Sequence, residues 1–274
     1  MLGGSSRTTL AGEGLQHQDG HSHILASTVP NVICYDPAFA YEIAVIVKDG
    51  IRRMYHDREP VYYYITVGNE VYGHPAMPEG VESGILHGLY KFQPANKPGK
   101  KPRVHLFGSG AILREAIKAQ ALLDEHFGVA ADVWSAPSYK CVRSEALACE
   151  RWNLLNPGKT PRVPYVTQVL ADEPWPVIAT SDYMKSLPEM IARWVPGGLF
   201  PLGTDGYGRS EARAELRDYF EIDARYVTLA ALQQLAAQGK FDRKKLVDAV
   251  ATLKINPAKF DPLHVPKGET LHEE

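Results

Sequence analysis

The densest group of reactive side chains lies in a glycine-flanked segment near the start of the chain. Residues 7–23 read Arg-Thr-Thr-Leu-Ala-Gly-Glu-Gly-Leu-Gln-His-Gln-Asp-Gly-His-Ser-His. Glycine costs roughly 1 kcal/mol relative to alanine inside a helix, so this segment predicts a loop. Loops of this kind often carry binding and catalytic side chains on a rigid scaffold. The candidate functional residues are Glu13, His17, Asp19, His21 and His23.

Three kinds of role fit this pattern. Histidine exchanges protons near neutrality because its unperturbed pKa is about 6.5, which suits acid–base catalysis or binding of an anionic substrate. Closely spaced His and Asp side chains also suit a metal ion, although the segment has none of the helical zinc motifs. The third role is purely structural, with histidines that only hydrogen-bond to the backbone.

Two further glycine-rich segments follow predicted strands. Gly108-Ser-Gly110 precedes a helix but lacks the third glycine of a dinucleotide fingerprint and any Walker lysine, so a structural turn is favoured. Residues 204–210, Thr-Asp-Gly-Tyr-Gly-Arg-Ser, place Arg209 where it could grip a carboxylate or phosphate. A subunit-contact loop capped by Ser210 is the favoured interpretation there.

The composition is that of a globular protein. The chain has 274 residues, 45% of them hydrophobic and 23% charged, with a net charge of -2. This balance predicts neither a nucleic-acid nor a membrane partner. The basic run Lys97–Arg103 is interpreted as a solvated linker. No stretch reaches the roughly 18 apolar residues of a membrane span, and the start does not resemble a signal peptide. Cys34, Cys141 and Cys149 form no metal-binding spacing, which indicates reduced thiols and a cytoplasmic location.

Alternating strands and helices are expected to position these residues on parallel sheets. Asp36 and Pro37 predict the N-cap and first turn of a helix. The predicted strands are 31–35, 61–67, 103–107, 131–135, 177–180 and 200–203. The predicted helices are 37–55, 111–127, 184–194, 211–220, 224–238 and 242–253.

The wording of the motifs resembles a known family. The segment Thr8–His23 is similar to the homodimeric, bacterial-type pyruvate dehydrogenase first component, a thiamine-diphosphate-dependent decarboxylase. The similarity continues in order from about residue 3 to about residue 255. It includes Tyr35-Asp-Pro37, Val61–Thr66, Pro75–Gly80, Leu106–Gly110, Cys149–Asn153, Thr160–Tyr165, Thr180–Met184 and Leu202–Ser210.

The resemblance covers only the C-terminal third of the family enzyme. It implies an α/β chain made of a remnant of a pyrimidine-binding thiamine-diphosphate domain followed by a transketolase C-terminal-like α/β domain. The expected parts are residues 1–92 in the first domain, a linker at 93–102, the second domain at 103–256 and a tail at 257–274. Met1-Leu-Gly-Gly resembles the interior of a family sequence.

The resemblance also implies site residues and a cofactor. His17 matches a histidine that reaches the cofactor and substrate pocket, and Glu13 matches a glutamate of the same loop. Asp19, His21 and His23 match the wording without an assigned catalytic step. The cofactor would be thiamine diphosphate with magnesium. The domain that binds its diphosphate, with a Gly-Asp-Gly…Asn signature, has no counterpart here, and the glutamate that activates the cofactor is expected upstream of Met1.

The implied function is decarboxylation of pyruvate and acetyl transfer to a lipoyl group, with little or no turnover by this chain alone. The implied partners are a small 2-oxo acid, a second copy or a separate N-terminal thiamine-diphosphate-binding subunit, and the lipoyl acetyltransferase core. The sequence departs from the family pattern at Ala11, Gly73-His74 and 136–143. An alternative is therefore a subunit of a related 2-oxo acid dehydrogenase that needs a separate N-terminal partner. A non-catalytic dimerisation module is another alternative. The last alternative function is that of a metallohydrolase, which would use His17, Asp19, His21 and His23.

Overall fold

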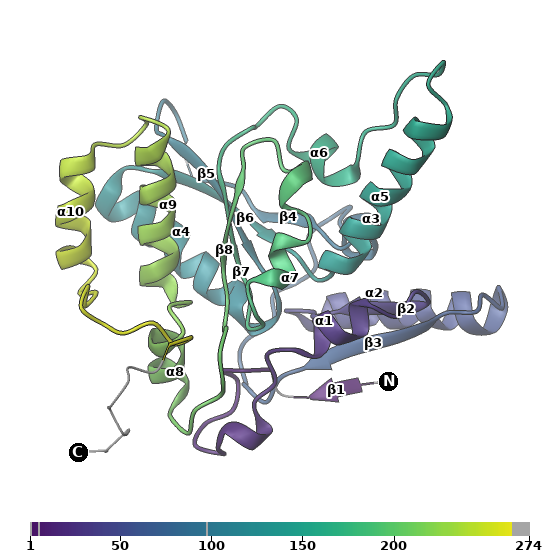
Figure 1. Cartoon of the computed structure of the whole chain (residues 1–274), viewed down its shortest axis with the longest axis horizontal. Helices are drawn as coiled ribbons and strands as arrows, with labels where there is room; N and C mark the ends of the chain where they lie inside the picture. Colours follow the sequence, from purple (N-terminus) through teal and green to yellow (C-terminus); the bar gives the residue numbers. More distant parts are fainter. Residues whose placement is uncertain (1, 5, 97, 265–274) are drawn as a thin grey trace.

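Two sheets rich in parallel strands form the framework of the protein (Figure 1). The computed structural model describes residues 2–4, 6–96 and 98–264. The first sheet has the order β1-β3-β2 with all strands parallel. The second has the order β4-β6-β5-β7-β8, in which only β4 is antiparallel. The strands are β1 (Leu2–Gly4), β2 (Val32–Tyr35), β3 (Tyr62–Val67), β4 (Tyr90–Gln93), β5 (Arg103–Gly108), β6 (Ala130–Ser135), β7 (Val177–Thr180) and β8 (Leu199–Leu202).

Helices cover both faces of the second sheet and also pack on the first (Figure 1). The longer helices are α2 (Ala40–Ile51), α4 (Leu113–Phe127), α5 (Tyr139–Leu155), α9 (Ala224–Ala237) and α10 (Arg243–Thr252). The shorter ones are α1 (Ser22–Ser27), α3 (Glu82–His87), α6 (Tyr165–Val169), α7 (Ser186–Glu189) and α8 (Arg213–Tyr219). Tight turns η1 (Leu15–His17), η3 (Gly110–Ile112) and η4 (Ala192–Trp194) and the π-helical turn η2 (Arg52–His56) complete the described elements. No helix in the described ranges has the length and hydropathy needed to cross a membrane.

The predicted α/β class and the predicted strands are confirmed. Strand β4 was not predicted, and its pairing with β6 places residues 90–93 in the second sheet. The domain bounds given above stay a prediction. The helices predicted at 111–127, 211–220, 224–238 and 242–253 are present as α4, α8, α9 and α10 with small shifts at their ends.

The helix predicted to start after Asp36 begins later, so Asp36 is not its N-cap. Helix α2 starts at Ala40, and the Glu42 carboxylate accepts the backbone N–H of Phe39 at 3.2 Å. Glu42 therefore satisfies the first amide groups of the helix, and Asp36 bonds elsewhere. Gly50 does not interrupt α2, because it lies buried in the helix against the Tyr63 ring.

The helix predicted at 184–194 is wrong in its extent. The structure has only the short α7 and the tight turn η4 in this segment. Pro188 lies inside α7 and has no backbone N–H, which prevents a long regular helix there. Cys149 and Trp152 lie in α5, a helix that the sequence pattern did not predict.

Three apolar clusters form the core, and two of them join the domains. One lies between the second sheet and α4, α8 and α9, and it also contains Ala38 and Phe39 from the segment before α2. A second lies on the opposite face, under α5, α6 and α7. The third packs the first sheet against α2 and α3 and includes Tyr90 of β4. Each domain therefore contributes side chains to the core of the other.

Candidate functional site

The carboxyl ends of strands from both sheets meet at one buried junction. Asp36 follows β2, Thr66 lies near the end of β3, and Ser109 follows β5. All three side chains are buried. In open parallel sheets, ligand-binding groups collect beyond the carboxyl ends of the strands. This junction is therefore the first place to look for a site.

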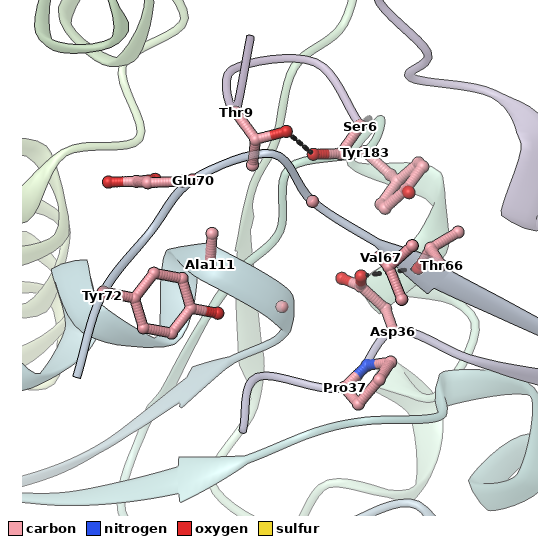
Figure 2. A pocket seen from close by; sticks show the side chains of 12 residues that line it. Ser6, Thr9, Asp36, Pro37, Thr66, Val67, Glu70, Tyr72, Ala111 and Tyr183 are labelled. Carbon is pink, nitrogen blue, oxygen red and sulfur yellow. Dashed lines mark hydrogen bonds between the residues drawn. The ribbon is translucent and has the colours of Figure 1, made fainter. Parts of the chain in front are cut away.

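Asp36 is the centre of this junction (Figure 2). Its carboxylate accepts hydrogen bonds from the Thr66 hydroxyl at 2.7 Å and the Ser109 hydroxyl at 2.8 Å. Burial raises the pKa of Asp36 to about 7, although these two hydrogen bonds act in the opposite direction. Asp36 thus connects the first sheet to the second through neutral partners.

His23 extends the same network toward the glycine-flanked segment. It lies in α1, is 3% exposed, and its Nε2 lies 3.0 Å from the Thr66 hydroxyl. Its ring makes edge contacts with Tyr64 and Tyr183. Burial lowers the pKa of His23 to about 4, so this imidazole is neutral at pH 7. The expected loop ends before His23, because α1 begins at Ser22.

The cavity beside Asp36 is too small for a cofactor or a 2-oxo acid. Its volume is about 30 Å³, which suits about one water molecule. Ser6, Thr9 and Tyr183 line it together with Asp36 (Figure 2). The buried junction is therefore interpreted as a structural connection between the domains.

Glu13 and His17 lie on the outer surface instead. Both are exposed and belong to the segment 11–17, which includes the tight turn η1. His21 is also exposed. Asp19 is half-buried and accepts the backbone N–H groups of His21 and Ser22, each at 2.9 Å, so it fixes the start of α1. The structure therefore separates the five predicted residues: Glu13, His17 and His21 are exposed, Asp19 is half-buried, and His23 is buried.

Loop 205–211 of the second domain supports the segment that carries Glu13 and His17. The Gln18 side chain donates to the Arg209 carbonyl at 2.6 Å and accepts the Arg209 N–H at 2.9 Å. The Gly12 N–H donates to the Glu211 carbonyl at 2.9 Å. These contacts hold the exposed face in a defined position relative to both domains.

Arg209 itself is engaged in packing. Its guanidinium lies 4.8 Å from the centre of the Tyr219 ring and 3.8 Å from the Glu211 carboxylate. The Gly108–Gly110 turn is engaged as well, since the Gly110 N–H donates to the Asp36 carbonyl at 3.0 Å. The N–H groups of Gly110 and Arg209 thus donate to partners within the protein.

Metal-ligand geometry is found elsewhere. Among the described residues, His105, Asp132 and Glu173 are the group whose ligand atoms lie within 4.8 Å of one another. None of them belongs to segment 13–23. His105 Nδ1 accepts from the Trp134 indole at 3.0 Å, and its Nε2 donates to the Glu173 carbonyl at 2.8 Å. Both ring nitrogens are therefore occupied, and the group serves packing of β5 and β6.

Sequence reasoning did not identify the junction residues or Gln18. One signal for the junction was present, because Asp36 and Ser109 directly follow apolar strands of a parallel sheet. Asp36 was instead interpreted as a helix cap. Gln18 gave no signal, since its partner Arg209 lies 191 residues away in the chain.

Comparison with known proteins assigns both halves of the chain. Residues 1–75 match the family model described as pyruvate dehydrogenase E1 component middle domain. Residues 88–223 match the transketolase-like C-terminal domain. Curated relatives named pyruvate dehydrogenase E1 component are 50% identical in Pseudomonas aeruginosa and 51% identical in Escherichia coli K12, each over 265 residues. These alignments cover 96% of this chain but only 30% and 29% of the relatives.

Solved structures show the same fold at low sequence identity. A transketolase from Leishmania mexicana matches with a TM-score of 0.61 and 14% identity, over 86% of this chain and 30% of that one. A structure described as a split gene transketolase, inactive beta4 tetramer, matches with a TM-score of 0.56 and 18% identity. That match covers 86% of this chain and 66% of the other.

Proposed function

Because this chain belongs to the pyruvate dehydrogenase E1 component family, we propose that it supplies one wall of a thiamine-diphosphate-dependent site that decarboxylates pyruvate. The chain spans about 30% of the length of its curated relatives. One observation carries the proposal: the segment with Glu13 and His17 is held by hydrogen bonds to loop 205–211 of the second domain, yet these two side chains are exposed. The opposite wall of the site then comes from polypeptide outside residues 1–274.

The described residues do not fit the diphosphate and magnesium part of the cofactor. The only described group with metal-ligand geometry contains His105, whose two ring nitrogens are already hydrogen-bonded. Magnesium also prefers carboxylate, phosphate and water oxygens in octahedral geometry. We therefore assign thiamine diphosphate and magnesium to the proposed partner polypeptide and derive no step through them.

The proposed roles in this chain belong to two side chains. His17 binds the 2-oxo acid carboxylate or exchanges a proton with the substrate. Glu13 exchanges protons on the same exposed face. Asp19 acts indirectly by fixing the start of α1, and His23 by bonding to Thr66. His21 is kept as an exposed neighbour of the site without an assigned step.

The proposed partners follow from the family. They are a second copy or an N-terminal thiamine-diphosphate-binding subunit, the lipoyl acetyltransferase core that accepts the acetyl group, and a small 2-oxo acid. A cytoplasmic location is part of the proposal, in keeping with the free thiols of Cys34, Cys141 and Cys149.

The test is reconstitution. The purified chain is incubated with pyruvate, thiamine diphosphate and magnesium, first alone and then with a polypeptide carrying the remaining part of the Escherichia coli relative. We expect carbon dioxide release only from the mixture. His17→Ala in the mixture should lower turnover by about 100-fold, the usual scale of acid–base catalysis. The exposed His126→Ala is the matched control. Turnover by the chain alone would refute the composite site.

A further inference from the structure

The segment that carries Glu13 and His17 has little structure of its own. Within residues 11–18, the backbone hydrogen bonds of the tight turn are long, with 3.3 Å from the His17 N–H to the Gly14 carbonyl and 3.2 Å from the Gln18 N–H to the Leu15 carbonyl. The Gln16 side chain adds a bond to the Glu13 carbonyl at 3.3 Å. Such bonds lie at the long end of the normal range. The position of the segment must therefore depend on contacts outside it.

Gly12 and Gln18 make those contacts. The Gly12 N–H donates to the Glu211 carbonyl at 2.9 Å, and the Gln18 side chain makes two hydrogen bonds to Arg209. Gln18 is 7% exposed, whereas the neighbouring His17 is exposed. The side-chain amide donates to the backbone carbonyl of Arg209 and accepts its N–H. This is the same pair of hydrogen bonds that two residues of antiparallel strands exchange. A buried amide satisfied on both sides is costly to disrupt, because each lost partner leaves a polar group without a hydrogen bond.

Gly208 makes this arrangement possible. A Cβ at this position would lie 2.6 Å from Gln18 Oε1, 2.8 Å from Gln18 Cβ and 3.1 Å from the Leu15 Cα. Any side chain would push the two segments apart. The close approach of the two segments therefore depends on one residue from each domain, the Gln18 side chain of the first and Gly208 of the second.

We propose that Gln18 is a positioning residue, which holds the Glu13 and His17 face against loop 205–211 so that both side chains meet the partner wall in one geometry. This inference rests on the proposed function. Gln18 touches no substrate in this arrangement and acts only through the segment that it anchors. A misplacement of about 1 Å at a reacting group is enough to slow a reaction by about 100-fold.

Hydrogen exchange measured by mass spectrometry tests the anchoring in the intact chain without any partner. In Gln18→Ala we expect exchange in peptides covering 8–18 and 205–211 to rise by about tenfold, the effect of losing two ordinary hydrogen bonds. Exchange in peptides from α4 and α9 should stay unchanged. Gln16→Ala, in the same turn but on its exposed face, is the matched control.

Gly208→Ala is the second variant. It keeps the amide but displaces it, so it should reproduce the local rise in exchange. If Gln18→Ala fails to fold, Gly208→Ala decides the question. Unchanged exchange in both loops of a folded variant overturns the proposal, and so does an equal rise in Gln16→Ala. Because hydrogen exchange is measured without turnover, its result does not depend on whether the reconstituted mixture is active.

A kinetic readout distinguishes positioning from general stability. In the reconstituted mixture, Gln18→Ala should lower kcat and kcat/KM equally, by about tenfold or more, with the KM for pyruvate unchanged. Unchanged kcat and kcat/KM in the folded variant would contradict the positioning role. A loss that disappears when protein concentration is corrected for unfolded material would contradict it too.

Discussion

At the scale of single residues, Asp36 illustrates how a buried carboxyl connects two sheets without a positive partner. Its hydrogen bonds come from hydroxyl groups of Thr66 and Ser109, one from each domain. Because neutral donors do not offset the cost of burying a full charge, the protonated form is favoured up to a pKa of about 7.

This raised pKa predicts a dependence of stability on pH. The unfolded chain releases the Asp36 proton near its ordinary pKa of 3.8, whereas the folded protein keeps it up to about 7. The folded state therefore binds more protons in this window, and the free energy of unfolding falls as pH rises through it. In the wild type, we expect the titration of Asp36 to lower the free energy of unfolding by about 2 kcal/mol between about pH 5 and about pH 8. This decrease should be absent in Asp36→Asn.

Urea unfolding at several pH values measures this effect. The exposed Asp172→Asn is the control, and it should keep the wild-type pH profile. A wild-type profile in Asp36→Asn would show that Asp36 does not titrate in this window. Asparagine can still bond to both hydroxyl groups, so the variant should fold.

Sequence pattern predicts some residues of the proposed site and not others. Glu13 and His17 stay a prediction, made because reactive side chains flanked by glycines are unusual. Asp36 was wrongly predicted to be a helix N-cap, because an aspartate before proline is typical of that position. In the structure, the Glu42 carboxylate accepts the first amide groups of the helix instead. The role of Gln18 depends on a partner 191 residues away, which no local pattern reveals.

At the scale of elements, the start of α2 is tied to the second sheet by Glu42. This carboxylate is fully buried and accepts hydrogen bonds from the Tyr90 hydroxyl in β4 and the Ser135 hydroxyl in β6, each at 2.6 Å. It also accepts the Phe39 N–H at 3.2 Å. One side chain thus caps a helix of the first domain and links two strands of the second.

Removing this carboxylate should destabilise the whole protein. Glu42→Ala leaves several buried donors without acceptors, each worth about 1–3 kcal/mol. We expect the free energy of unfolding to fall by about 3 kcal/mol or more, measured by urea denaturation. The exposed Glu82→Ala in α3 should change it by less than about 0.5 kcal/mol. Equal effects of the two substitutions would contradict this account.

The elements differ in how well sequence pattern predicts them. Strands β5, β6 and β7 are nearly or fully buried along their length, and their apolar runs were found directly. Helix α5 was missed although its buried residues, Tyr139, Val142, Ala146 and Cys149, follow helical spacing. Strand β4 was missed because only one of its four residues is buried, so its place depends on pairing with β6.

At the scale of the whole molecule, a buried ion network crosses between the domains. Arg217 in α8 is 5% exposed and pairs with Glu70, which follows β3, and with Glu115 of α4 at 3.5 Å. Breaking a buried network by removing one charge leaves the others poorly compensated. The relative placement of the domains should depend on this arginine.

Arg217→Ala should therefore lower the free energy of unfolding by about 3 kcal/mol, the usual scale for a broken buried ion pair. For a chain of this size, that corresponds to a decrease of several degrees in Tm, about 2–4 °C for each kcal/mol. Differential scanning calorimetry measures it, with the exposed Arg243→Ala as control. A Tm equal to that of the control would show that the network contributes nothing.

The order of the two domains along the chain was available from the resemblance, but their degree of mixing was not. Sequence pattern assigns Phe39 to the first domain, and its side chain packs in the main core of the second. Tyr90, which the predicted bounds also place in the first domain, lies on a strand of the second sheet and packs with α2 and α3. Such exchanges are visible only in three dimensions.

This exchange of core residues has a practical consequence for protein engineering. If the chain were cut between the two sheets, Phe39 and the core of the second sheet against which it packs would end up in different pieces. Tyr90 would likewise be separated from α2 and α3. Each piece would then expose apolar surface that is buried in the intact chain. Newly exposed apolar surface of this kind promotes aggregation. The smallest portable unit is thus the pair of domains together, and a graft into another scaffold should move both.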